Sequence, residues 1–182
     1  MTNRYVLLVL VGACGSDPVS FSEPVGIELK AKSGDVAQNV VSEDKDITTE
    51  SGNPYGAFVN DATQKLGHAP SRIEIDSLTL SLGADSTGVV ALEEVVTGDV
   101  DVSFLVNDTS DTFDAAHVSS PTGVGPLDMD PSFDFTSAGA VDQARLLAGS
   151  FKVVLRAPAA AAFSGKGATA TLETTFTFTA FD

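Results

Sequence analysis

Apolar and polar residues alternate along much of this chain, in short stretches that end at glycine, proline or asparagine. A period of two places successive side chains on opposite faces, which is typical of a β-strand with one buried face. We expect strands over residues 25–31, 72–82, 98–108, 113–118, 133–135, 150–157 and 168–182, with a further short strand near Val40.

The stretch 72–82 carries the clearest strand pattern, with one irregularity. Ile73 and Ile75 share one face, whereas Leu78 and the next two leucines share a face that is out of phase by one residue. One extra residue in a strand restores the inward set, so this slip predicts a β-bulge at Asp76–Ser77.

Residues 54–66 show helical periodicity instead. Asn53 is a favoured N-cap residue, Pro54 suits the first helical position, and Gly67 can end a helix in the left-handed conformation. One helical stripe collects the apolar side chains Phe58, Val59, Ala62 and Leu66. The pattern predicts a surface helix of about three turns.

The order of these elements indicates the fold class. Strands do not alternate with long helices, which argues against a parallel sheet. Strands with one polar face are typical of antiparallel sheets packed face to face. We therefore expect one all-β domain, an antiparallel β-sandwich of immunoglobulin-like or jelly-roll type. Two or three short helices lie in its connections, with helical turns expected over 89–96 and 141–149.

Composition narrows the function. The 182 residues are 43% hydrophobic, and 25 acidic residues against 10 basic ones give a net charge of −15. Such an acidic protein repels phosphate backbones, so we expect no nucleic-acid partner. One cysteine excludes a disulfide within the chain, and two histidines argue against a histidine-rich metal centre.

The start of the chain has its own pattern. Residues 6–13 are all apolar or small, Arg4 precedes them, and the only cysteine, Cys14, follows. This run is too short to span a bilayer, which takes about 20 residues. It matches the apolar region of a secretory signal peptide.

The sequence Val11-Gly12-Ala13-Cys14 resembles the lipobox of bacterial lipoproteins. In that family a peptidase cuts before the cysteine, whose sulfur carries a diacylglyceryl group. The resemblance implies a signal peptide over residues 1–13 and a lipid-anchored protein of the bacterial cell envelope. Gly15 stands where an aspartate would retain a lipoprotein in the inner membrane, so the resemblance also implies the outer membrane.

A first β-strand that ends in a buried free cysteine is the alternative. Gly12, Gly15 and Asp17 argue against it, because they interrupt the strand pattern abruptly. On the lipoprotein interpretation, residues 14–23 form the lipidated N-terminus and a tether, and residues 24–182 form a single domain.

Two acidic clusters offer oxygen ligands for a hard cation such as calcium. They contain Asp108, Asp111 and Asp114 in the first cluster, and Asp128, Asp130 and Asp134 in the second. The second cluster departs from an EF-hand loop, because Phe133 stands where glycine is needed and Gly139 where the bidentate glutamate belongs. A calcium site and solvated acidic loops are the two expectations.

We expect no catalytic residues and no enzyme. His117 lies near Ser119 and Ser120, but the chain has no GxSxG motif, and proximity in sequence does not make a catalytic triad. Spacing alone assembles no set of acid, base and nucleophile.

The sequence favours a membrane-anchored lipoprotein whose domain is a non-catalytic structural, adhesive or assembly module, with a protein partner in the cell envelope. The alternative is a carrier that binds a small apolar ligand in a cavity of the sandwich. Eight phenylalanines could line such a cavity or fill a core: Phe58, Phe104, Phe113, Phe133, Phe135, Phe151, Phe176 and Phe178. No cofactor other than calcium is expected.

Overall fold

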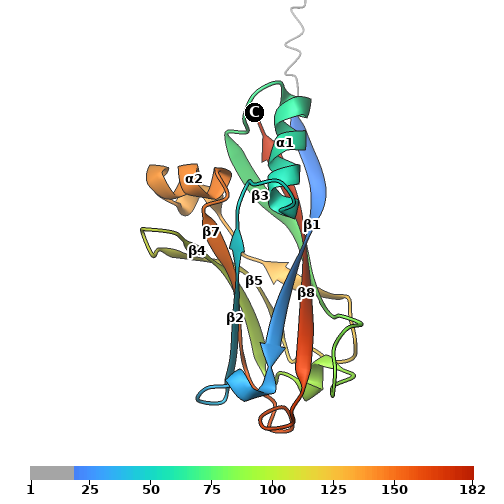
Figure 1. Cartoon of the computed structure of the whole chain (residues 1–182). Helices are drawn as coiled ribbons and strands as arrows, with labels where there is room; N and C mark the ends of the chain where they lie inside the picture. Colours follow the sequence, from blue (N-terminus) through green and yellow to red (C-terminus); the bar gives the residue numbers. More distant parts are fainter. Residues whose placement is uncertain (1–18) are drawn as a thin grey trace, which may run out of the picture.

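The computed structural model describes residues 19–182, and eight β-strands with two α-helices form its framework (Figure 1). The strands are β1 (Ser20–Lys32), β2 (Val40–Ile47), β3 (Arg72–Leu82), β4 (Asp99–Val106), β5 (Thr112–Ser119), β6 (Leu127–Pro131), β7 (Phe151–Pro158) and β8 (Thr169–Phe181). The helices are α1 (Pro54–Leu66) and α2 (Ala140–Leu147), and short 3₁₀ segments lie at Ser33–Asp35, Leu92–Glu94 and Phe135–Ser137. The predicted class, all-β with short helices in the connections, is confirmed.

All eight strands belong to one antiparallel sheet, in the order β1-β8-β3-β6-β5-β4-β7-β2. The short strand β6 pairs with β3 on one side and β5 on the other, so it joins two groups of strands that a sandwich would keep apart. The edge strands β1 and β2 approach each other without pairing, which makes the sheet a nearly closed barrel. The expected sandwich of two separate sheets is not confirmed.

The core is most aromatic where α1 packs onto β1 and β8, at one end of the barrel. The ring of Phe178 stacks on Phe176 at a centroid distance of 5.1 Å and lies 5.4 Å from the ring of Tyr55. The buried hydroxyl of Tyr55 donates to the C=O of Leu146 at 2.8 Å, and burial raises the pKa of this tyrosine above its usual range. These contacts hold α1 and the end of α2 against the same core.

Strand β1 extends further than its sequence pattern predicts. Val25, Ile27 and the alternate apolar residues after them face the core, as expected. The strand begins at Ser20, however, and pairs with β8 in one unbroken register from Ser20 opposite Phe181. Residues 20–23, which the sequence places in a tether, therefore belong to the folded domain.

Helix α1 confirms the predicted start and stop signals. The side chain of Asn53 accepts a hydrogen bond from the N–H of Tyr55 at 3.0 Å, and Pro54 is the first residue of the helix. Gly67 ends the helix with φ of 82°, a left-handed conformation that glycine adopts without a Cβ clash. Within residues 19–182, neither helix combines the length and the apolar character that crossing a bilayer requires.

The predicted bulge in β3 is also confirmed. The pairing of β3 with β8 shifts between Ile75 and Ser77, so the extra residue is Asp76. The carboxylate of Asp76 accepts a hydrogen bond from the hydroxyl of Thr179 on β8. The bulge lets Ile75 and Leu78 both face the core.

The strand predicted through Phe133 and Phe135 is wrong. β6 lies earlier in the chain, and residues Phe135–Ser137 form a 3₁₀ turn. Asp134 starts this turn, because its side chain accepts a hydrogen bond from the N–H of Thr136 at 2.9 Å. The ring of Phe133 still packs against Phe104 at 5.1 Å, so its apolar character reflects packing and not strand pairing.

Strand β2 covers eight residues, where the sequence predicts only a short strand near Val40. Its inward positions alternate correctly, and Val41 and Ile47 are buried. The two inward positions between them hold Glu43 and Lys45, which break the hydrophobic pattern. These two charges lie where the barrel fails to close.

Candidate functional site

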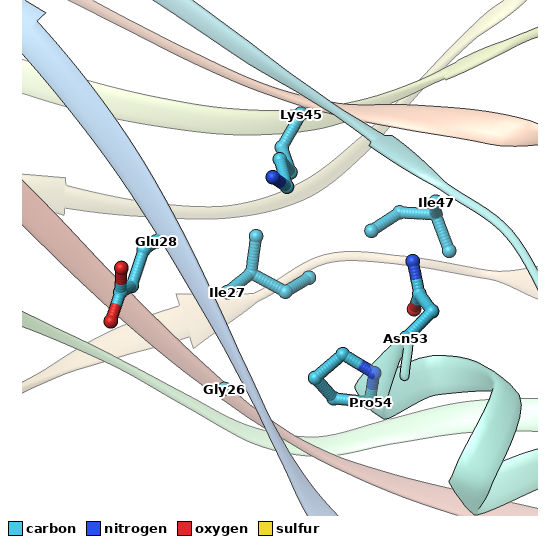
Figure 2. A pocket seen from close by; sticks show the side chains of 7 residues that line it. All are labelled: Gly26, Ile27, Glu28, Lys45, Ile47, Asn53 and Pro54. Carbon is cyan, nitrogen blue, oxygen red and sulfur yellow. The ribbon is translucent and has the colours of Figure 1, made fainter. Parts of the chain in front are cut away.

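A groove runs between the unpaired edge strands β1 and β2 (Figure 2). One pocket, of about 240 Å³, is lined by Gly26, Ile27, Glu28, Lys45, Ile47, Asn53 and Pro54. A second pocket, of about 420 Å³, continues along the same two strands and is lined by Glu28, Leu29, Lys30, Glu43, Asp44 and Lys45. Both pockets share Glu28 and Lys45, and together we call them the β1–β2 groove.

The floor of the groove is apolar at Ile27 and Ile47, and its rim is charged. The inward residues Glu43 and Lys45 of β2 add one charge of each sign to the floor. Ile27 and Ile47 extend into the first pocket from opposite strands, and both are almost fully buried. Lys45 stands beside them, while the carboxylate of Glu28 points away from the pocket toward the outer face of the barrel. Pro54 and the cap residue Asn53 close the end of the pocket nearest α1.

Alternate residues of β1 direct their backbone hydrogen-bonding groups toward this groove. The N–H of Ser33 donates to the C=O of Ala168 at 3.0 Å, and the N–H of Asp182 donates to the C=O of Val19 at 3.3 Å. Both bonds continue the β1–β8 register, so the odd-numbered residues of β1 exchange backbone hydrogen bonds with β8. The even-numbered residues therefore direct their N–H and C=O groups into the groove: Gly26, Glu28 and Lys30.

Strand β2 has the same arrangement from the opposite side. The N–H of Ala159 donates to the C=O of Asn39 at 2.8 Å, in line with the β2–β7 register. The even-numbered residues of β2 thus direct their backbone N–H and C=O groups toward β1, and Asp44 and Asp46 are among them. Among residues 19–182, no strand pairs with either edge on this side. Pro24 of β1 occupies one such even position, where its missing N–H costs the sheet nothing.

The pKa of Glu43 reflects the environment inside the groove. Burial raises the pKa of its carboxyl group, and the nearby carboxylates of Asp35 and Asp44 raise it further, while Lys32 lowers it. Charged side chains that point inward from an edge strand hinder indiscriminate pairing between sheet edges. The raised pKa of Glu43 indicates that the groove is partly shielded from water. The inward charges also make the groove a poor site for an arbitrary strand edge.

The structure does not gather the six aspartates of the two predicted acidic clusters. Asp108 pairs with Arg145, whose Nη1 lies 2.6 Å from its Oδ2. Asp134 caps the 3₁₀ turn, and the hydrogen bonds from Thr136 lower the pKa of its carboxyl group. The others lie on the turn after β4 or along strands: Asp111, Asp114, Asp128 and Asp130. In the part of the chain that the structure describes, no three His, Cys, Asp or Glu residues form a group that could hold a metal ion.

His117 lies on the outer face of β5, and its side chain is about half exposed. Its Nε2 is 3.8 Å from Oδ2 of Asp130, on the neighbouring strand β6. A shallow pocket of about 200 Å³ adjoins it, lined also by Asp101, Asp114 and Ser132. No hydrogen bond joins His117 to a serine within residues 19–182, so the arrangement does not resemble an activated nucleophile.

No family model, curated protein or solved structure matches this chain.

Sequence reasoning missed the β1–β2 groove. The apolar residues of β1 indicate a strand, but nothing in them shows which edge stays unpaired. The only available signal was the pair Glu43 and Lys45, which occupy inward positions of a short strand flanked by Val41 and Ile47. Cys14 and the lipobox-like residues before it lie outside the described residues, so lipidation stays a prediction.

Proposed function

We propose that this chain is a lipid-anchored protein of the bacterial cell envelope, whose β-barrel domain binds or assembles with a protein partner and performs no catalysis. The observation that carries the proposal is the sequence Val11-Gly12-Ala13-Cys14, followed after five residues (15–19) by the first strand of a folded domain. Two or three acyl chains on one cysteine give stable membrane attachment, which a single chain does not.

This arrangement implies an orientation. Five extended residues span at most about 18 Å, so the anchor would hold the start of β1 close to the membrane. The C-terminus and α1 lie at that same end of the barrel (Figure 1). The turn at Ser33–Asp35 and the connection between β7 and β8 lie at the opposite end, where they would face away from the membrane. The β1–β2 groove runs along the side between these ends.

The carrier alternative has less support. It would place an apolar ligand beside the phenylalanines, yet in the described residues these rings pack on one another. Phe104 lies 5.0 Å from Phe151, 5.1 Å from Phe133 and 5.8 Å from Phe176, measured between ring centroids. The pockets that border the groove are open and partly charged. We therefore favour a binding or assembly module over a carrier.

Metabolic labelling with a palmitate analogue tests the anchor. We expect the native chain to incorporate the label and the Cys14→Ser chain to lose it, because Cys14 is the only cysteine. Val11→Leu is a matched control, because it introduces the residue that is more usual at this position of the lipobox, and this variant should keep the label. Equal labelling of the native and Cys14→Ser chains would overturn the proposed anchoring and localisation.

A further inference from the structure

The β1–β2 groove is bounded by two rows of backbone groups that have no strand partner among residues 19–182. Gly26, Glu28 and Lys30 present theirs from β1, and Asp44 and Asp46 present theirs from β2. Unpaired N–H and C=O groups on a strand edge are the groups with which an added strand pairs. The groove thus offers main-chain hydrogen bonds on both sides of a floor that contains Ile27 and Ile47 together with the inward charges Glu43 and Lys45.

The surroundings of the groove limit what can enter it. The 3₁₀ turn Ser33–Asp35 joins its two strands at one end, and Asn53 and Pro54 stand at the other. Strand β2 of the same molecule lies opposite β1, in the position that the edge strand of a second folded copy would need. The space suits a single extended segment and not the edge of another barrel.

Within residues 19–182, the carboxylate of Glu28 on the outer rim of the groove has no salt-bridge partner. Glu28 lies directly opposite Glu173 in the β1–β8 register, and like charges in this position repel each other. Lys30 is the nearest basic residue on the same edge, but its Nζ lies 3.4 Å from Oδ2 of Asp85. A pocket of about 270 Å³ adjoins both glutamates, so a cation from outside can reach them.

The rim formed by β2 is acidic as well. Asp44 and Asp46 share one cation, Lys152, whose Nζ lies 2.8 Å from an oxygen of Asp44 and 3.8 Å from one of Asp46. In an extended ligand, alternate side chains would face the floor at Ile27 and Ile47, and the others would face these carboxylates. Apolar residues suit the floor and basic residues suit the rim.

We propose that the β1–β2 groove binds a short extended peptide, with lysine or arginine alternating with apolar residues, which adds as a strand to the free edge of β1. This inference names a partner class for the binding module proposed above and rests on that proposal. It does not depend on the lipid anchor.

The test measures binding to the full-length chain carrying Cys14→Ser, so that anchoring plays no part. The probe is a fluorescein-labelled peptide of alternating lysine and valine, and the readout is fluorescence anisotropy at about 150 mM salt, which screens long-range attraction. A second probe has the same side chains but an N-methyl group on every backbone nitrogen, so neither of its edges can donate a hydrogen bond. We expect on the order of tenfold weaker binding for it, because it cannot donate backbone hydrogen bonds to β1 in either direction.

Two variants of one residue locate the site on the protein. Gly26→Pro removes an N–H that faces the groove and leaves the hydrogen bonds to β8 in place, as Pro24 already does two residues earlier. A Cβ at Gly26 would meet no atom within 4 Å, so Gly26→Ala is a matched control. We expect Gly26→Pro to weaken binding on the order of tenfold and Gly26→Ala to leave it unchanged.

A third variant, Glu28→Lys, should bind the lysine peptide more weakly than the native protein does, and it should bind more tightly a peptide in which glutamate replaces lysine. Equal binding of the plain and N-methylated peptides would overturn the proposal. This comparison needs no substitution within the folded domain. A peptide-independent dimer that protects Gly26 and Glu28 from hydrogen exchange would also overturn it, in favour of a second copy. If labelling at Cys14 fails while these results hold, only the anchoring is wrong.

Discussion

Glu43 is the residue at which burial and charge conflict in this domain. It points inward from β2 between two buried apolar residues, Val41 and Ile47, yet it carries a carboxylate beside those of Asp35 and Asp44. A fully closed barrel would place another strand and an apolar side chain there. The unclosed edge lets water reach the carboxylate, which makes the charge tolerable.

We expect Glu43→Gln to stabilise the protein near pH 7. Because the folded state raises the pKa of Glu43, the native protein has its full stability below the ordinary glutamate pKa of about 4.3 and loses some as the pH rises through the higher folded value. The variant lacks this loss. Urea unfolding between pH 3 and 8 should show the two stability curves meeting at low pH and separating above it.

Glu50→Gln is the matched control for this experiment, since Glu50 is exposed and lies outside the sheet, and its replacement removes the same charge. A gain for Glu43→Gln that is equally large at pH 3, or equally large for Glu50→Gln, would mean that burial at residue 43 is not its cause.

At the scale of single elements, α1 shows how much local signals decide. Its N-cap, its first proline and its terminal glycine are all in the sequence, and the helix begins and ends where they predict. Its N-terminus also forms one wall of the β1–β2 groove. Weakening the cap should therefore affect both the helix and the groove.

Asn53→Ala should lower the free energy of unfolding by about 1 kcal/mol, because the N–H of Tyr55 loses its side-chain acceptor. Asn53→Asp keeps an acceptor at the same position and should lie close to the native protein. Chemical denaturation of the three proteins measures the difference. Identical midpoints for Asn53→Ala and the native chain would show that the cap contributes nothing.

Elements that bury one consistent set of apolar side chains in the core were predictable from the sequence. The slip between Ile75 and Leu78 predicted the bulge in β3, because both residues must reach the same core. Phe133 and Phe135 misled the prediction, because Asp134 between them hydrogen-bonds to the following backbone and forms a turn. A polar residue between two aromatic residues fits a strand and a capped turn equally well.

The groove was beyond sequence reasoning for a different reason. It depends on two strands, β1 and β2, that are close in the chain and approach each other but do not pair. Each finds its partner far away in the sequence, β8 for β1 and β7 for β2. Period and propensity describe one strand at a time, so they do not reveal an unpaired edge.

At the scale of the whole molecule, charge is the dominant feature. The formal net charge of −15 makes the folded state repel itself, and the ion pairs within the described residues are mostly exposed and individually weak. Stability should therefore depend on ionic strength.

Raising the sodium chloride concentration from about 10 mM to about 150 mM shortens the screening length from about 30 Å to about 8 Å. We expect the midpoint of thermal unfolding to rise by a few degrees, because self-repulsion in the compact state decreases. Potassium chloride at the same ionic strength should give the same rise if screening is the cause. A constant or lower midpoint would contradict this account.

Among the eight strands, the short strand β6 has the fewest backbone pairs with its neighbours. It holds β5 through only Ala116 opposite Pro131 and His117 opposite Asp130, whereas β1 and β8 are paired along their whole length. In the strand order, β6 lies near the middle, away from the unpaired edges β1 and β2, so the barrel wall is held by the fewest backbone pairs on the side opposite the groove.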